Sequence, residues 1–168
     1  MAVNLLEYAG ASEYIYKISE INLSEMLKSF INMKREEFFS NGINIDSYIE
    51  ENLKIVGDIE KIKMLFDVII RNAIEASDIE KSSNIIRIEA RESDWIEIKI
   101  YDNGIGIDDK LIQQIYEPLV TTKVQGTGLG LTIAKDICMR HGAEISIISE
   151  KKHYTQVLLK FKKEIKLT

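Results

Sequence analysis

Alternating apolar and polar residues occur in adjacent pairs of short runs, and this pattern most constrains what the chain can fold into. One pair of runs covers Ile85 to Glu92 and Trp95 to Tyr101, and a second pair covers Ala143 to Ser149 and Tyr154 to Phe161. Side chains two residues apart on a β-strand share a face, so each run predicts a strand with one buried face. Strands that follow each other after a short turn favour a mixed or antiparallel sheet.

Apolar residues at helical spacing separate these strands. They predict four helices, from Leu23 to about Phe39, from Asp58 to about Ser77, from Lys110 to Ile115 and from Leu129 to His141. Between the first two helices, Ile43 to Ile49 and the "KIVG" that follows predict two strands, or one strand and a stub. This order of elements predicts an α+β fold with the helices on one face of the sheet.

The composition limits the class of protein. A chain of 168 residues, 45% of them apolar, is one domain's worth and can bury a full core. No apolar run reaches the roughly 18 residues of a membrane span, and the N-terminus lacks the basic start of a signal peptide, so we expect a cytoplasmic protein. The single cysteine, Cys138, excludes an internal disulfide, and the net charge of -5 argues against a nucleic-acid surface.

An acidic residue stands on the apolar face of one predicted strand. Asp102 in "WIEIKIYDNGIGI" has the same parity as Ile96, Ile98 and Ile100, so its carboxylate is expected to point into the protein. A buried carboxylate needs a partner. The Asn103-Gly104 dipeptide that follows predicts a tight turn, but a turn does not explain an inward acid.

Two further features stand out. Asn72 in "IIRNAIEAS" puts an amide on the apolar face of its helix, where a backbone carbonyl, a buried water or a ligand would have to satisfy it. The stretch "GTGLGL", Gly126 to Leu131, precedes a predicted helix. Such a loop lets backbone N–H groups at a helix N-terminus approach an anion, although a glycine-rich turn alone is a weak signal.

Together, and in this order, these segments resemble a known family. "RNAIEA", "DNGIGI", "YEPLVTTK" and "GTGLGL" are similar to the N box, first glycine box, F box and second glycine box of the ATP-binding catalytic domain of sensor histidine kinases. That domain belongs to a larger group with type II topoisomerases, mismatch-repair ATPases and heat-shock chaperone ATPases. The resemblance runs from about Asn22 to Phe161.

The resemblance implies a two-layer α/β sandwich, the Bergerat fold, with a mixed, mostly antiparallel sheet and ATP between the layers. Residues 21–168 would form the ATP-binding domain. On pattern alone, residues 1–20 are either the tail of a preceding helix with a linker or a ragged domain start. Their "LLEYAG" resembles the end of the second helix of a dimerisation and acceptor domain.

The resemblance also implies site residues. Asp102 would accept a hydrogen bond from the adenine amino group, and Asn72 would hold the Mg²⁺ ion that bridges the ATP phosphates. Gly104 and Gly106 would let the chain pass close to the base. The residues implied to contact the phosphates are Gly126, Thr127, Gly128, Leu129, Gly130 and Lys123, with Arg71 as a further cation. Tyr116, Pro118 and Thr122 would belong to a loop that covers the nucleotide.

Three positions depart from the family pattern. Many of these kinases carry a second asparagine, and the ATPase relatives a water-activating glutamate, where this chain has Val68. The adjacent Asp67 is about a hundred degrees around the helix, so it is a poor substitute. Glu75 stands where many histidine kinases have a lysine.

The expected activity is that of a protein-histidine kinase whose acceptor histidine lies outside this chain. The only histidines, His141 and His153, follow the ATP motifs, and His141 at the end of a helix is expected to be structural. The resemblance implies an acceptor-histidine domain in the same protein and a response regulator as partners, and it allows a homodimer and a membrane anchor in the intact protein. The alternatives are an ATPase of the same fold and an anti-sigma serine kinase.

Overall fold

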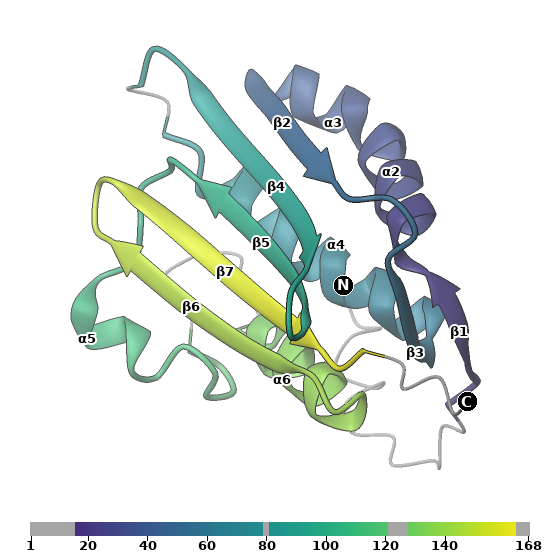
Figure 1. Ribbon diagram of the computed structural model, residues 1–168. Helices are drawn as coiled ribbons and strands as arrows, with labels where there is room; N and C mark the ends of the chain where they lie inside the picture. The colour runs from purple at the N-terminus through teal and green to yellow at the C-terminus, as the bar shows by residue number, and fades with distance from the viewer. Residues whose placement is uncertain (1–15, 79–80, 121–127, 164–168) are drawn as a thin grey trace.

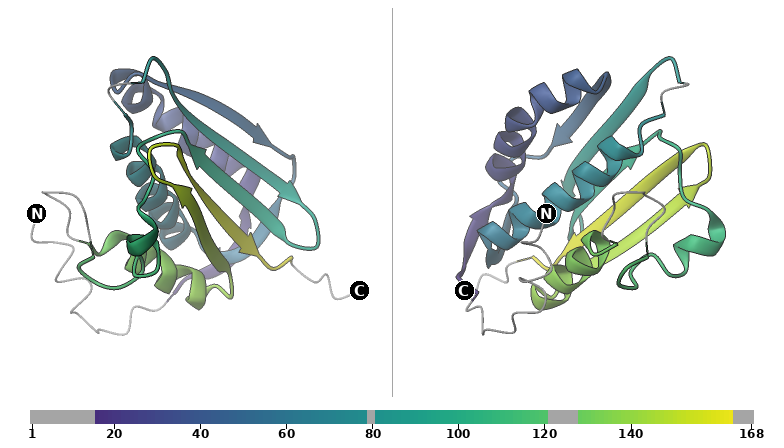
Figure 2. Two further views of the ribbon diagram at one scale, coloured as in Figure 1. Left: turned by 90° about the vertical axis from the view of Figure 1, so that its left-hand side faces the viewer. Right: turned by 180° about the vertical axis from the view of Figure 1, so that it is seen from behind.

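The molecule consists of a sheet covered on one face by helices, with a second, smaller sheet beside it (Figure 1). The computed structural model describes residues 16–78, 81–120 and 128–163. In the right-hand view of Figure 2, which is turned by 180° from Figure 1, the longer helices lie nearer the viewer than the strands, so helices and sheet form two layers. The predicted α+β sandwich is confirmed.

The main sheet has the strand order β2-β4-β5-β7-β6. Its strands are β2 (Ile43–Ile49), β4 (Asn84–Glu92), β5 (Ile96–Asp102), β7 (Tyr154–Phe161) and β6 (Glu144–Glu150). Strand β2 pairs in parallel with β4, and the other pairs are antiparallel. A parallel pair needs a long crossover, which the chain makes through β3 and α4. The mixed, mostly antiparallel sheet is therefore as expected.

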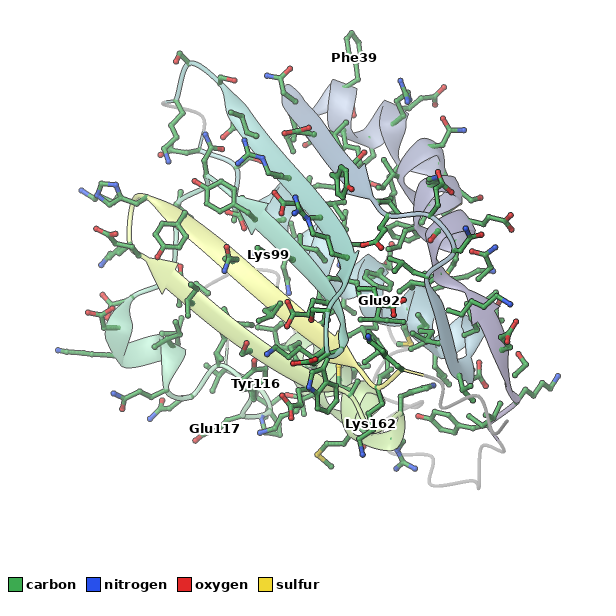
Figure 3. The ribbon with its side chains drawn as sticks, in the orientation of Figure 1. Phe39, Glu92, Lys99, Tyr116, Glu117 and Lys162 are labelled. Carbon is green, nitrogen blue, oxygen red and sulfur yellow. The ribbon has the colours of Figure 1, made fainter. Side chains whose placement is uncertain are left out.

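The two faces of this sheet differ as the alternation predicts. On β5, Ile96, Ile98 and Ile100 are buried beneath the helices. The opposite face carries cross-strand ion pairs, such as Arg87 with Asp46 at 3.0 Å. Lys99, labelled in Figure 3, lies on this exposed face.

The helices are α2 (Leu23–Met33), α3 (Arg35–Ser40), α4 (Ile59–Glu75), α5 (Asp109–Ile112) and α6 (Gly130–Arg140). The single helix predicted from Leu23 to Phe39 is in fact two, because α2 ends before Lys34 and α3 starts after it. The break turns Phe38 into the core, while Phe39 is 86% exposed and projects from the molecule in Figure 3. Among the described residues, no helix combines the length and the apolar character that crossing a membrane requires.

The smaller sheet pairs β1 (Ile18–Asn22) antiparallel to β3 (Lys54–Asp58). Strand β1 was not foreseen, because Ile18 is exposed and Ile21 is the only buried residue among its five. Residues 18–20 belong to the segment expected to be a helix tail with a linker or a ragged domain start, and they form the start of this strand. The reading of residues 1–15 as the end of a helix lies outside the described residues.

Asp58 joins the small sheet to the longest helix. Its Oδ1 accepts the N–H groups of Glu60 (3.0 Å) and Lys61 (3.2 Å), which caps α4 at its predicted start, and its Oδ2 accepts the N–H of Lys17 at 2.8 Å. Burial by itself raises the pKa of this carboxyl group, but these backbone donors outweigh burial and hold the pKa below its ordinary value.

Replacing Asp58 by alanine should lower the free energy of unfolding by roughly 1–3 kcal/mol, because the cap is lost and the Lys17 N–H loses its acceptor. Because the folded-state pKa is depressed, the carboxylate stabilises the fold fully above the ordinary pKa of about 3.9, and this contribution is lost as pH falls through the folded-state value. Urea unfolding across acid pH measures both effects. Asp108→Ala, which removes the cap of the four-residue α5, is the control with a smaller expected loss.

Candidate functional site

Helix α4 brings the two glycine segments together. A Cβ atom on Gly130, the first residue of α6, would lie 3.3 Å from a methyl group of Val68, and one on Gly104 would lie 2.2 Å from the carbonyl oxygen of Ala76. Residues four apart on a helix lie on the same face. Asn72 is four residues from both Val68 and Ala76, so its half-buried side chain lies between the two glycine segments.

Asp102 ends β5 with its side chain turned inward, as predicted. It is 6% exposed, and in the sheet it lies between Ile86 of β4 and Thr155 of β7. Its Oδ1 accepts the N–H of Gly104 at 3.0 Å, which fixes the carboxylate over the turn that follows the strand. The acid therefore sits at the strand end nearest the C-terminus of α4.

The glycines of this turn are required by contacts within the protein. The N–H of Ile105 donates to the carbonyl oxygen of Ala76 at 2.8 Å, which leaves no room for a side chain on Gly104. Gly106 has a φ of +62°, and a Cβ there would lie 2.1 Å from the carbonyl oxygen of Glu150. Close contacts with the main chain at Ala76 and Glu150 explain both glycines, whereas the resemblance had implied only that the chain passes close to the base.

The side chains of Lys81 and Asn103 hold the same turn. Lys81 donates from Nζ to the carbonyl oxygen of Asn103 and to those of Gly104 (3.2 Å) and His153 (3.3 Å). The Asn103 side chain accepts the N–H of Ile85 at 2.7 Å, which continues the β4–β5 pairing by one step. The Asn-Gly dipeptide signalled a turn, but no pattern in the sequence singled out Lys81.

The second glycine segment is described from Gly128 onward. Gly128 has a φ of +65°, and a Cβ there would lie 2.4 Å from the carbonyl carbon of Leu119. Leu119 donates its N–H to the Gly128 carbonyl at 3.1 Å, itself has a φ of +67° and is 71% exposed. Leu129 is buried beside them. The predicted phosphate residues Lys123, Gly126 and Thr127, and Thr122 of the covering loop, lie outside the described residues.

Helix α6 begins directly after this segment. Among the described residues, no side chain caps its N-terminus, and its first turn holds no acidic residue. The N–H groups of a first helical turn have no partner inside the helix, and the helix dipole favours an anion there. The N-terminus of α6 therefore has the chemistry of an anion site, and Val68 and Asn72 place it beside α4.

The F-box segment is attached to α6. Thr132 donates its hydroxyl to the carbonyl oxygen of Tyr116 at 3.1 Å, and the Lys135 ammonium lies 4.9 Å from the centre of the Tyr116 ring. Burial raises the pKa of Tyr116 to about 12, so its hydroxyl stays protonated at neutral pH. Tyr116 is labelled beside β6 in Figure 3. Pro118 precedes the exposed Leu119 in this loop.

The charged residues around Asn72 are engaged elsewhere. Arg71, a predicted phosphate cation, is exposed and lies 4.0 Å from Glu75 one turn on. Asp67 forms an ion pair with Lys34 at 2.7 Å, so it points away from Asn72, as expected from its place on the helix. Val68, in contrast, is 4% exposed and packs against Gly130. No carboxylate occupies the position one turn before Asn72.

Known proteins are similar to this chain in sequence. A family model described as histidine kinase-, DNA gyrase B-, and HSP90-like ATPase matches residues 57–165. Sporulation kinase B of Bacillus subtilis is 31% identical over 151 residues, which cover 89% of this chain and 35% of that protein. Sporulation kinase C of the same organism is 32% identical over 168 residues, covering 95% of this chain and 37% of that protein. The chain thus spans about a third of the length of these kinases.

The fold agrees with these relatives. The catalytic domain of histidine kinase ThkA, in a nucleotide-free form, is similar with a TM-score of 0.76 and 26% identity, covering 88% of this chain and 96% of that one. The matched family segment contains Asn72, Asp102 and both glycine segments. The chain therefore belongs to the family of histidine kinase-, DNA gyrase B- and HSP90-like ATPases, and it has the fold of a histidine kinase catalytic domain.

Proposed function

We propose that this chain binds ATP with Mg²⁺ as the catalytic part of a two-component sensor histidine kinase and transfers the γ-phosphoryl group to a histidine outside the chain. The observation that carries the proposal is the position of Asn72 on α4, between the turn after Asp102 and the N-terminus of α6. A base-binding acid, a phosphate-binding helix end and a metal-binding amide then line one region.

Asp102 would recognise adenine. Its carboxylate is buried and held in place by the Gly104 N–H, so it presents an acceptor of fixed orientation, which suits the exocyclic amino group of the base. The N–H groups of Gly128, Leu129 and Gly130 would bind phosphate oxygens at the start of α6. The resemblance adds Lys123, Gly126 and Thr127 to the phosphate contacts, with Arg71 as a weaker candidate because Glu75 competes for it.

Asn72 would hold Mg²⁺ through its amide oxygen. In the described residues no group of three His, Cys, Asp or Glu side chains could bind a metal by itself. A single amide oxygen therefore fits an ion that arrives with the phosphates and keeps water as its other ligands, which is usual for Mg²⁺. When bound, the ion would neutralise charge on the transferring phosphoryl group.

Val68 favours transfer over hydrolysis. General-base activation of water needs a side chain within hydrogen-bond reach of the water. One turn before Asn72, where such a base would stand, Val68 offers only methyl groups packed against Gly130. Catalysis would then rest on orientation and on electrostatic stabilisation of the γ-phosphoryl group, which a nucleophile from outside the chain attacks, as in other phosphoryl transfers. This observation disfavours an ATPase machine of the same fold.

The acceptor would be a histidine in another part of the protein. His141 hydrogen-bonds with Asp58 and Ile137, and His153 lies in the turn between β6 and β7, 3.7 Å from Glu150. Neither is a helical histidine followed by an acid. This chain spans only about a third of the length of these relatives. We therefore propose that the segment before β1 belongs to the end of an acceptor domain and its linker. We also propose a response regulator as the final partner, a homodimer for the intact protein and the cytoplasm as its location.

Asp102→Asn should weaken ATP binding at least tenfold, about 1.4 kcal/mol, because an amide NH₂ would face the adenine amino group. The amide oxygen can still accept the Gly104 N–H, so the turn should stay folded. Isothermal titration calorimetry measures the affinity. Asp46→Asn, on the exposed face of β2, is the matched control and should bind normally. Equal affinity in Asp102→Asn would contradict the adenine contact.

Asn72→Ala should remove most of the dependence of ATP affinity on Mg²⁺. In the wild type, Mg²⁺ should strengthen ATP binding because the ion links the phosphates to the amide oxygen. Titrations with Mg²⁺ and with a chelator give the ratio of the two affinities. Asn44→Ala, a surface asparagine bonded to Ser83, controls for loss of an amide. A full Mg²⁺ effect in Asn72→Ala would rule out this metal ligand.

The chain alone should hydrolyse ATP very slowly and should not label itself from radioactive ATP, because Val68 stands where a water-activating base would be and neither of its two histidines has the context of an acceptor. Mixed with a separately expressed acceptor domain of the same protein, it should transfer phosphate to histidine, which is acid-labile and base-stable. Brisk hydrolysis by the chain alone would instead indicate the ATPase class. Acid-stable phosphate on a partner serine would indicate an anti-sigma kinase.

A further inference from the structure

His141, at the C-terminal end of α6, connects three segments that are distant in the sequence. Its Nε2 lies 3.0 Å from the backbone nitrogen of Asp58, at the junction of β3 and α4. Its Nδ1 lies 2.7 Å from the carbonyl oxygen of Ile137, one turn back in its own helix. Its ring also contacts that of Tyr16, with centroids 5.4 Å apart, just before β1.

These contacts define the state of the ring. A carbonyl oxygen only accepts and a backbone N–H only donates, so Nδ1 carries the hydrogen and Nε2 accepts. The imidazole is therefore neutral where it caps α6. The expectation that His141 is structural holds, but its reason differs, because the ring acts as an acceptor for another element and not as a cation at the helix dipole.

The main chain next to Asp58 is shaped for this ring. A Cβ atom on Gly57 would lie 2.7 Å from Cδ2 of His141, so any side chain there would displace the imidazole. Asp58 in turn accepts the N–H of Lys17 and caps α4. One carboxylate and one imidazole thus tie the start of β1, the start of α4 and the end of α6 to each other.

Helices α4 and α6 contact each other at both ends of a stretch of similar length in each helix. From Asp58 to Val68 is ten residues of α4, about 15 Å, and from Gly130 to His141 is eleven residues of α6, about 16 Å, at 1.5 Å per residue. His141 meets Asp58 at one end, and Gly130 meets Val68 at the other. The two helices therefore run in opposite directions. Because α6 has a fixed length, the position of His141 along α4 determines the position of Gly130 along α4.

We infer that His141 is a positioning residue for phosphate binding, because its hydrogen bond to Asp58 sets the axial position of α6 against α4. The N–H groups at the start of α6 then stand at a fixed distance from Asn72. The inference rests on the proposed binding of phosphates at that helix end. A cap that only stabilises the fold would have no such effect on the other end of α6.

The two roles differ in which ligand they affect. Adenosine would use the Asp102 region alone, whereas ADP would add phosphates at the start of α6. Loss of the His141 contact should therefore weaken ADP binding and spare adenosine binding. A stability effect alone would change both affinities by the same factor, through the folded fraction, or change neither.

Three variants make the test. His141→Phe keeps a ring but removes both hydrogen bonds, and it should weaken ADP binding with Mg²⁺ at least fivefold while the adenosine affinity, measured by NMR titration, changes less than twofold. His141→Gln can place Oε1 near the position of Nε2 and should restore ADP affinity to within twofold of the wild type. Asn41→Ala removes a side-chain bond to the Glu37 carbonyl at the end of α3 and is the matched control.

A measurement without ligand separates this inference from the proposed function. In the nucleotide-free protein, the backbone amide resonances of Leu129 and Gly130 should shift in His141→Phe and stay unchanged in Asn41→Ala. Unshifted resonances, or equal loss of ADP and adenosine affinity, would overturn the positioning role. Shifted resonances in a protein that binds no ADP would keep the link between the helix ends and refute the phosphate site.

Discussion

The close approach of two main-chain segments to one face of α4 is the contact on which the site depends. The carbonyl oxygen of Ala76 lies 2.2 Å from the position that a Cβ of Gly104 would take, and a methyl group of Val68 packs against Gly130. A side chain on Gly104 would require displacement of the backbone at Ala76, and one on Gly130 would require the Val68 methyl group to give way by a few tenths of an ångström. Both segments are therefore fixed relative to the same helix, and Asn72 lies between them whatever ligand the site holds.

Much of this arrangement could be predicted, because the spacing of apolar residues along a helix and their alternation along a strand are local properties of the sequence. The inward direction of Asp102 follows from alternation along one strand, and the start of α4 follows from Asp58 as a cap. The break in the first helix and strand β1 could not be read, because both depend on partners distant in sequence. Ile18 is exposed and pairs with β3 through its backbone, which leaves no apolar signal.

The site was predictable only where a motif carried it. Asn72 and Asp102 stood out as polar residues on apolar faces, and the resemblance supplied their roles. Lys81 did not stand out, and the partner of His141 at Asp58 could not be predicted, because each side chain acts on backbone atoms that only folding brings near. The reason for Gly104 was also invisible, since the clash involves the carbonyl oxygen of Ala76, 28 positions earlier in the chain.

The two ends of α4 make different contacts. At its start, Asp58 holds the backbone of Lys17, where the chain leads into β1, and its N–H is held by His141. Toward its end, Asn72 lies beside the proposed nucleotide site. A helix is stiff along its axis because each turn is hydrogen-bonded to the next. Asp58 therefore connects Lys17, just before β1, to Asn72 along α4 and, by way of His141, to the N-terminus of α6.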